Sequence, residues 1–485
     1  MKTFFLLITA LPVFIGSSVA QTILWEAPVE VSNGSNGNAG PEIVLTDDGD
    51  PVVLWGEAGP DKVWLSAWTG TAFGPAVQVN TGGFASPVYD FGGIDLAAAN
   101  GNLFIVFENY THGILLVRSV DGGQTFEPAV HVYDLEPGLF ATLATVVTDA
   151  GGNPVVSFIL ENDNETQGTY RTARSNDAGL TFQAVVTASE PADGDYVCEC
   201  CSADLAVSGD TLWLAFRRND NNLRDIWVSR STDNGNTFDI ATDVDNINWN
   251  SPVCPISGPK IARTGDNLIT TWMSQFSGQA RVHISSTDPV NMISTSQLTL
   301  PLSGAGNQNR PDIAVSETGI AVVWEETGIP GNTTDILMAY SETGVSTLPD
   351  AIANVTQAPG IQRFPSIVYG TGAFHLVYAD VVSGKVFYRR GTPGLVSNRE
   401  IHGSKNQLEI YPNPAVQEIV ITPPFSGDYT FSLYNWQGQL AYQALGEAVV
   451  GNKQSFDLGT LPVGIYMARF QGGKGVYLGN LLLAK

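Results

Sequence analysis

Four cysteines are the residues whose type and spacing point most directly to chemistry. Three of them form a Cys-x-Cys-Cys motif at Cys198, Cys200 and Cys201, and the fourth is Cys254. In an exported protein an even number of cysteines favours disulfides, most simply between Cys254 and one member of the motif, with the other two strained or free. Four thiolates would alternatively suit a soft metal ion, copper(I) or zinc, or a redox site. The sequence leaves both interpretations open.

Arginines and carboxylates form the second group of candidates. Arg218, Arg310 and Arg363 each lie beside the end of a predicted strand, and three guanidiniums could hold an anionic ligand. Glu325 could then supply a general acid and Tyr378 a nucleophile. The side chains predicted to contact a ligand are Asp90, Glu161, Arg217, Arg310 and Arg363. The competing interpretation of each is a solvated charge or an ion pair between neighbouring repeats.

A repeated segment organises the elements that must position these residues. Arg-Ser-Val-Asp-Gly-Gly-Gln-Thr-Phe at residues 118–126 returns as Arg-Ser-Asn-Asp-Ala-Gly-Leu-Thr-Phe at 174–182 and Arg-Ser-Thr-Asp-Asn-Gly-Asn-Thr-Phe at 230–238. Successive copies are 56 residues apart. A fixed period of this length is typical of repeat architectures, in which each unit buries its apolar face against its neighbours.

Each unit is predicted to hold four β-strands. The second strands are apolar segments that end in an aromatic residue, at Trp55, Phe107, Phe158, Phe216, Trp272, Trp324 and Tyr378. Four-stranded units of roughly 50 residues are propeller blades, so the sequence predicts an all-β propeller of seven blades, with six as the alternative. The last unit lacks a fourth strand, and we expect a strand at residues 28–32 to complete it and close the ring.

The predicted propeller sorts its loops onto two faces. The repeated segments connect third and fourth strands and lie on one face. The ends of second strands and the starts of first strands lie on the other face, where binding sites are expected. All four cysteines and the candidate arginines fall on this second face, and the cysteines of neighbouring blades should meet there.

The two ends of the chain differ from the propeller. Residues 1–20 combine a basic residue, an apolar core and small residues at their end, which predicts a secretory signal peptide. The propeller is predicted at 21–392, a linker at 393–405 and a small β-sandwich at 406–485. No other segment is apolar for long enough to span a membrane.

The chain is strongly acidic, with a formal net charge of −25. Such a surface repels phosphate backbones, so nucleic acid is excluded as an expected partner. The acidity suits the solubility of an extracellular protein.

The three repeated segments match Ser-x-Asp-x-Gly-x-Thr-Phe, and through them the body of the chain resembles the sialidase-like propellers that carry Asp-box (BNR) repeats. We expect a structural role for the box, because its serine and aspartate oxygens cap the backbone of a turn. The box residues are Ser119, Asp121, Ser175, Asp177, Ser231 and Asp233. The chain departs from the family's enzymes in lacking the Arg-Ile-Pro sequence that carries the first arginine of their triad, and in having seven predicted blades where they have six.

The tail contains Leu-Glu-Ile-Tyr-Pro-Asn-Pro at residues 408–414, Leu-Tyr-Asn-Trp-Gln-Gly at 433–438 and Leu-Pro-Val-Gly-Ile-Tyr at 461–466. With these segments it resembles the C-terminal sorting domain of proteins exported by the type IX secretion system of Bacteroidetes. The resemblance implies Sec export, the secretion machinery as a partner, and release from or attachment to the cell surface. An ordinary adhesive sandwich domain is the alternative.

Three functions fit these features. The first is binding of an extracellular glycan or protein ligand on the face that carries the cysteines. The second is an exo-glycosidase that acts on sialic acid or another acidic sugar, with Tyr378 or Tyr110 as nucleophile. The third is metal or redox chemistry at the cysteines, where copper or zinc would be the cofactor; no other cofactor is predicted.

Overall fold

The structure, a computed structural model, describes residues 22–32, 38–59, 61–89, 92–162, 168–192, 197–316, 319–329, 333–350, 352–394, 408, 410–435, 440–472 and 475–484. The predicted signal peptide at residues 1–20, the candidate ligand-binding residue Asp90 and residues 395–405 of the predicted linker lie outside these described residues. The chain forms two compact units, Met1–Val396 and Ser397–Lys485.

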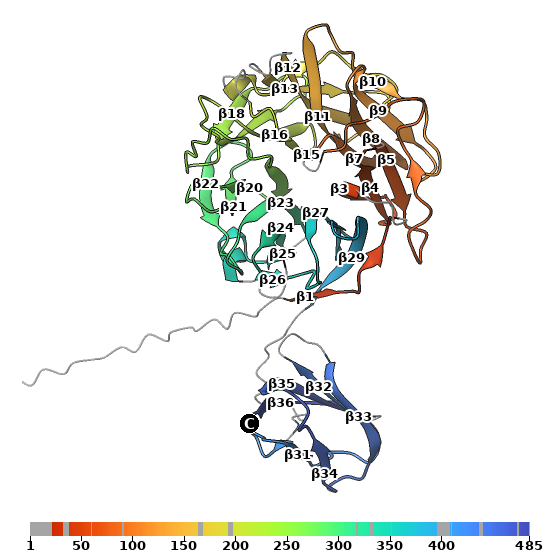
Figure 1. Cartoon of the computed structure of the whole chain (residues 1–485), viewed down its shortest axis with the longest axis vertical. Helices are drawn as coiled ribbons and strands as arrows, with labels where there is room; N and C mark the ends of the chain where they lie inside the picture. Colours follow the sequence, from red (N-terminus) through yellow and green to blue (C-terminus); the bar gives the residue numbers. More distant parts are fainter. Residues whose placement is uncertain are drawn as a thin grey trace, which may run out of the picture. The chain divides into compact units, whose positions relative to one another are not determined.

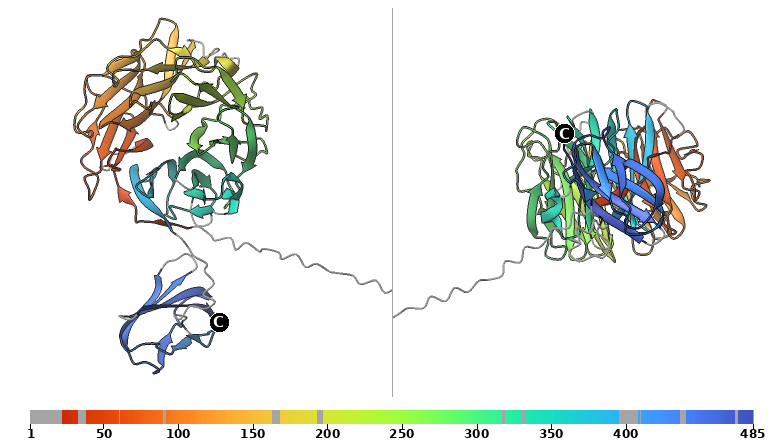
Figure 2. Two further views of the ribbon diagram at one scale, coloured as in Figure 1. Left: turned by 180° about the vertical axis from the view of Figure 1, so that it is seen from behind. Right: turned by 90° about the horizontal axis from the view of Figure 1, so that it is seen from below.

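The first unit is a ring of antiparallel β-sheets, seen from both sides in Figures 1 and 2. Seven sheets make up the ring within the described residues, and we number them as blades 1 to 7 in chain order. The predicted all-β propeller is therefore confirmed, with seven blades. The helical turns in the described part of the chain are two short 3-10 helices, η1 (Glu190–Ala192) and η2 (Val345–Asp350).

The strands of the blades follow one another from the inside of the ring outwards. Blade 1 contains β3 (Asn38–Leu45), β4 (Pro51–Glu57), β5 (Lys62–Ala67) and β6 (Val77–Gln78), and blade 2 contains β7 (Ile94–Ala99), β8 (Asn102–Asn109), β9 (Gly113–Ser119) and β10 (Val130–Tyr133). Blade 3 contains β11 (Leu139–Thr148), β12 (Pro154–Asn162), β13 (Gly168–Arg174) and β14 (Val186–Thr187), and blade 4 contains β15 (Asp204–Ser208), β16 (Thr211–Arg217), β17 (Ile226–Ser231) and β18 (Ile240–Asp243). Blade 5 contains β19 (Lys260–Thr264), β20 (Asn267–Ser274), β21 (Arg281–Thr287) and β22 (Ser294–Thr299), and blade 6 contains β23 (Gln308–Val315), β24 (Ile320–Thr327), β25 (Thr334–Ser341) and β26 (Ile352–Asn354). Blade 7 contains β27 (Gln362–Gly370), β28 (Ala373–Asp380) and β29 (Lys385–Gly394), and is completed by β1 (Thr22–Trp25) and β2 (Val29–Glu30).

The second strands are buried on both faces, which explains why their sequences are continuous apolar runs without polar alternation. In β8 every residue after Asn102 is buried. The hydrophobic core lies between neighbouring blades: Leu54 of blade 1 belongs to the same cluster as Leu96 and Phe107 of blade 2. Each blade thus depends on both neighbours for the burial of its apolar side chains.

The N-terminal residues close the ring. β29 pairs with β28 on one side and with β2 on the other, where Val29 lies opposite Tyr388. This is the closing strand expected at residues 28–32. β1 extends the same edge, with Thr22 opposite Gly394, and was not predicted. Pairing of both strands with β29 covers the edge that blade 7 would otherwise expose.

The second unit is the predicted small β-sandwich. One sheet contains β30 (Ile410–Tyr411), β31 (Glu418–Ile421) and β34 (Gln454–Asp457), and the other contains β32 (Gly427–Asn435), β33 (Leu440–Ala448), β35 (Gly464–Gly472) and β36 (Gly475–Leu483). Phe431, Phe456 and Phe470 pack together between the sheets. All buried residues of this cluster belong to the second unit, so the unit has a core of its own.

Candidate functional site

Arg310 and Arg363 lie side by side on one carboxylate. Arg310 Nη1 donates to Glu325 Oε1 at 2.7 Å, and Arg363 donates from Nε to Oε2 at 3.2 Å and from Nη2 to Oε1 at 3.3 Å. Both guanidiniums also lie over the ring of Phe364, at 4.9 and 4.6 Å from its centroid. The arginine side chains are 14% and 29% exposed, and that of Glu325 is 6% exposed. We call these four residues the arginine cluster.

β-Bulges aim the side chains of the arginine cluster. The register of β23 shifts between residues 309 and 312, and that of β27 shifts between residues 363 and 366. Arg310 has a φ of 46° and Phe364 a φ of 57°, in the left-handed region that residues other than glycine seldom adopt. Bulges re-aim side chains, and strained backbone of this kind concentrates at functional sites.

The structure does not bring Arg218 and Tyr378 into the arginine cluster. Arg218 lies over the ring of Trp227, at 5.3 Å from its centroid, and 3.7 Å from Asp220. Tyr378 is 4% exposed and stacks on Phe387, and burial raises its pKa to about 12. The structure therefore does not show the predicted arginine triad with Tyr378 as nucleophile, because β28 has neighbours packed on both faces.

Two further predicted ligand contacts are buried. Arg217 is fully buried, and its guanidinium donates to the carbonyl oxygens of Ser257, Arg224 and Met273. Glu161 is buried as well. Arg217 thus ties loops and strands of blades 4 and 5 together instead of facing a ligand.

Aromatic side chains that the sequence analysis did not assemble lie on the same face, at blades 2 and 3. The ring of Tyr110 stacks on that of Phe140 with centroids 6.3 Å apart, and its hydroxyl lies 3.3 Å from that of Tyr89. Tyr110 is 56% exposed. Glu108, buried beneath, accepts hydrogen bonds from the Thr142 hydroxyl and the backbone N–H of residue 143. We call Tyr89, Tyr110 and Phe140 the aromatic platform.

The inner strands gather charged side chains around the axis of the ring. Glu42, Asp95, Asp204, Lys260 and Asp312 occupy corresponding positions on five inner strands and interact electrostatically; we call them the axial cluster. Burial raises the pKa of Glu42 to about 8 and that of Asp204 to about 6. Burial alone would lower the pKa of Lys260, but the surrounding carboxylates raise it instead.

Carboxylates of the axial cluster also join neighbouring blades. Asp95 accepts from the Thr145 hydroxyl and from a backbone N–H of blade 3 at 2.8 Å. Asp204 accepts from the N–H of Ile261 at 2.7 Å, and Asp312 accepts from that of Ile367 at 2.7 Å. Blades 2 and 3, 4 and 5, and 6 and 7 are thereby linked at the centre of the ring.

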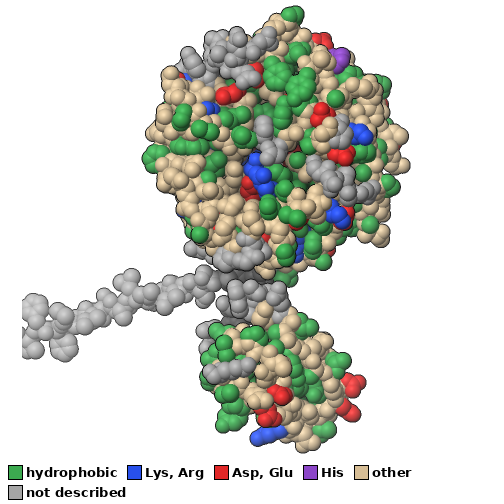
Figure 3. Space-filling view, viewed as in Figure 1, with side chains coloured by type: hydrophobic (Ala, Val, Ile, Leu, Met, Phe, Trp, Pro, Cys, Tyr) green, Lys and Arg blue, Asp and Glu red, His purple; other side chains and the backbone are tan. Residues whose placement is uncertain are grey.

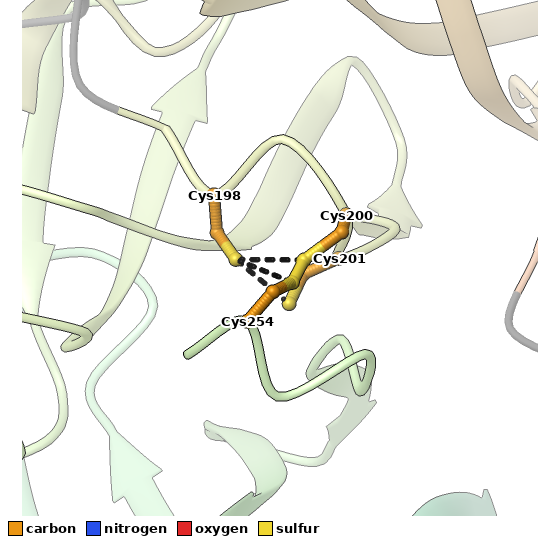
Figure 4. A group of neighbouring side chains, drawn as sticks. All are labelled: Cys198, Cys200, Cys201 and Cys254. Carbon is orange, nitrogen blue, oxygen red and sulfur yellow. Dashed lines mark hydrogen bonds between the residues drawn. A yellow bond between two sulfur atoms is a disulfide. The ribbon is translucent and has the colours of Figure 1, made fainter. Parts of the chain in front are cut away.

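The four cysteines meet between blades 4 and 5, and all four sulfurs lie within 4.8 Å of one another. Figure 4 shows their side chains pointing toward one another, three from the loop before β15 and Cys254 from the loop before β19. Cys200 and Cys254 form a disulfide, whereas Cys198 and Cys201 are free and buried. The prediction that Cys254 pairs with the motif is confirmed. We call these residues the cysteine cluster.

The two free thiols form a hydrogen-bonded pair in a cationic setting. Cys198 Sγ lies 3.0 Å from Cys201 Sγ, and Arg224 Nη1 donates to Cys198 Sγ at 3.1 Å. Burial by itself raises the pKa of Cys201, but the hydrogen bond from Cys198 and the charge of Arg217 outweigh it and lower the pKa to about 7. Thiolate character near neutral pH follows from this arrangement.

The Asp boxes make local hydrogen bonds. Ser175 Oγ accepts from the N–H of Gly179 and donates to Asp177 Oδ1, each at 2.8 Å, while Asp177 accepts from the N–H and hydroxyl of Thr181. The same bonds recur in the boxes of Ser119, Asp121, Ser231 and Asp233. These bonds lie within the turn itself and stabilise it.

Residues 409–483 match the family model described as a secretion system C-terminal sorting domain. Fold and match together define the class of protein: an exported seven-bladed β-propeller whose C-terminal type IX sorting domain directs it to the cell surface or the extracellular space. The secretion machinery is accordingly a partner of this domain. No helix in the described residues is both long and apolar enough to cross a membrane.

Solved structures with similar folds include a protein of unknown function from Dyadobacter fermentans, at 12% identity and a TM-score of 0.46, covering 66% of this chain and 98% of that one. A Trypanosoma rangeli sialidase in complex with the inhibitor DANA has 11% identity and a TM-score of 0.44, covering 95% and 89%. A Penicillium chrysogenum α-L-arabinanase has 12% identity and a TM-score of 0.43, covering 70% and 99%. A comparison with curated proteins gave no significant match.

Proposed function

We propose that the exported propeller binds an acidic extracellular glycan on the face that carries the arginine cluster. The observation that carries the proposal is the pair of guanidiniums, Arg310 and Arg363, held side by side and partly exposed. Guanidinium groups match the planar geometry of a sugar carboxylate or the oxygens of a sulfate. Because Glu325 already holds both guanidiniums in place, their side chains lose less conformational entropy when a ligand binds.

The aromatic platform and the surface chemistry of the ring support the same proposal. In Figure 3, basic and acidic side chains adjoin near the middle of the ring. Tyr110 presents an exposed ring beside the hydroxyl of Tyr89, and aromatic faces with a few convergent polar groups are the usual lining of ligand sites. An extended glycan with an acidic residue could use both features of this face.

A glycan array probed with residues 21–485 tests the proposal. We expect signal from acidic glycans and a loss of roughly tenfold or more in affinity for Arg363→Ala, because charge-assisted hydrogen bonds are lost. Arg118→Ala is the matched control: Arg118 also pairs with a carboxylate, Glu127, but at an Asp box on the opposite face, and its removal should leave the signal unchanged. Equal binding by Arg363→Ala, or binding of neutral glycans alone, would contradict the proposal.

An exo-glycosidase acting on sialic acid or another acidic sugar is the second candidate, and it rests on Tyr89 and Glu108. The two side chains interact by a hydrogen bond, and burial raises the pKa of both, with Glu108 raising that of Tyr89 further. Fluorogenic sialosides offered between about pH 4 and 8 test for a Tyr89 nucleophile assisted by Glu108. Release by the wild-type protein that is lost in Tyr89→Phe would support this function, and absence of release at every pH would exclude it.

A further inference from the structure

The cysteine cluster has the dimensions of a metal-thiolate site. Four sulfur ligands at about 2.3 Å from a tetrahedral ion lie about 3.8 Å from one another. Cys198 Sγ lies 3.6 Å from Cys200 Sγ and 3.9 Å from Cys254 Sγ, close to that spacing. Its 3.0 Å separation from Cys201 Sγ is shorter, and Cys200 and Cys254 are joined covalently. Of the six sulfur pairs of a tetrahedron, two thus have the expected spacing and two are shorter, while the remaining pairs, Cys201 with Cys200 and with Cys254, lie within 4.8 Å.

The protein around the cysteine cluster suits a negatively charged centre. One divalent ion with four thiolates carries a net charge of about −2, and an uncompensated charge of that size would be costly to bury. Two buried guanidiniums adjoin the sulfurs. Arg224 donates to Cys198 Sγ at 3.1 Å, and the charges of both Arg217 and Arg224 act on Cys201. Because arginine stays protonated in proteins, these two cations are permanent.

We propose that the cysteine cluster, with all four cysteines reduced, binds one thiophilic metal ion, zinc or copper(I). Cys198, Cys200 and Cys201 come from blade 4 and Cys254 from blade 5, so the ion joins two neighbouring blades. Each thiol that binds releases its proton to solvent, and the metal keeps its oxidation state. The Cys200–Cys254 disulfide is the metal-free state, which forms when an external thiol oxidant removes two electrons and two protons from these two thiols.

The metal content of residues 21–485, made in a reducing cytosol and purified without chelator, tests this site directly. We expect about one metal ion per chain by elemental analysis, and zinc or copper as its identity. Thiol titration should find the cysteines unreactive in the native protein and four reactive thiols after denaturation. A metal-free protein that takes up neither ion after reduction would overturn the proposal.

Variants and a spectroscopic probe separate binding from folding. Cys201→Ser should lower bound metal at least tenfold, whereas Glu199→Gln, in the same loop but without a sulfur, should retain it. If Cys201→Ser fails to fold, cobalt(II) added to reduced, metal-free wild-type protein supplies the independent readout. Intense thiolate-to-cobalt charge transfer supports four-sulfur ligation, and its absence contradicts it.

The test stands apart from that of glycan binding. Arg363→Ala alters the arginine cluster on blades 6 and 7 and should keep its metal, while Cys201→Ser should keep the preference for acidic glycans if the ring stays folded. Loss of metal together with unchanged glycan binding would assign the ion to the joint between blades 4 and 5.

Discussion

Glu326 is fully buried next to the arginine cluster, yet its role is structural. Oε1 accepts from the N–H groups of Ser303 and Gly304 at 2.6 and 2.7 Å, and Oε2 accepts from Trp324 Nε1 and Gln308 Nε2 at 3.0 Å each. Both oxygens thus face only donors. An amide cannot replace this carboxylate without placing its NH2 group opposite two donors.

We therefore expect Glu326→Gln to lower the free energy of unfolding by roughly 1–3 kcal/mol, because its amide NH2 would face N–H groups. Glu57→Gln is the control: Glu57 Oε2 accepts a hydrogen bond from Trp64 Nε1 at 2.8 Å, and the oxygen of a glutamine can still accept it. Its effect should stay within about 0.5 kcal/mol. Urea unfolding followed by tryptophan fluorescence compares the two, and equal stability of both variants would contradict the assignment.

Single residues show where sequence reasoning succeeds and where it ends. The repeat period placed Arg310, Arg363 and Glu325 on one face, and the structure brings them together. The repeat period could not distinguish these three residues from Arg217 and Tyr378, which also lie near strand ends. Strands that are buried on both faces lack the polar alternation that would indicate which way each side chain points. Arg217 is covered by the loop at Ser257, whose carbonyl oxygen accepts its hydrogen bond, and these two residues lie far apart in sequence.

At the scale of elements, the second strands and their aromatic ends were predictable because their sequences are apolar throughout. The bulges were not, since Arg310 and Phe364 adopt left-handed backbone that no local pattern of residue types requires. Part of the axial cluster is recognisable in the sequence from a repeated tripeptide. Pro41-Glu42-Ile43 recurs as Pro259-Lys260-Ile261, Pro311-Asp312-Ile313 and Pro365-Ser366-Ile367. The polar residue between Pro and Ile thus marks Glu42, Lys260 and Asp312, whereas Asp95 and Asp204 lack this pattern.

Removal of β1 and β2 tests how much ring closure contributes. A chain that begins at Ser32 leaves β29 without its outer partners and withdraws Ile23 and Trp25 from the packing of blade 7. We expect the propeller's Tm to fall by about 5 °C or more and aggregation to increase, because an edge is exposed. Differential scanning calorimetry with light scattering measures both.

Deletion of residues 397–485 is the matched control for this truncation. The sorting domain has its own core, so the propeller transition should stay in place when the domain is absent. An unchanged propeller Tm after loss of β1 and β2 would show that the six other blades hold the ring without them.

For the whole molecule, the axial cluster makes stability depend on pH. Glu42 has its pKa raised by burial from 4.5 to about 8, so the folded protein binds a proton there that the unfolded chain has released. Its stabilising contribution is present below about pH 4.5 and is lost as the pH rises through about 8. Asp204, with a pKa raised to about 6, acts in the same direction.

We expect the free energy of unfolding of the wild-type protein to decline between pH 5 and 8, and Glu42→Gln to remove a part of that decline amounting to a few kcal/mol. Guanidinium unfolding at several pH values measures the difference. Burial lowers the pKa values of His283 and His375 to about 4. Their contribution to the pH dependence of stability is the same in variant and wild type, so it cancels in the difference. Glu127→Gln, which removes a carboxylate outside the axial cluster, serves as the matched control; identical slopes for the wild type and Glu42→Gln would contradict the assignment.

The pairing of residue 22 with residue 394 also fixes the order of events when the protein is made. The first strand of the ring has no partner until the last blade has been synthesised, so a growing chain can stack blades but cannot complete the circle. Pairing residues this far apart in sequence slows folding. A chain that is made N-terminus first therefore keeps its ring open until β29 has been synthesised.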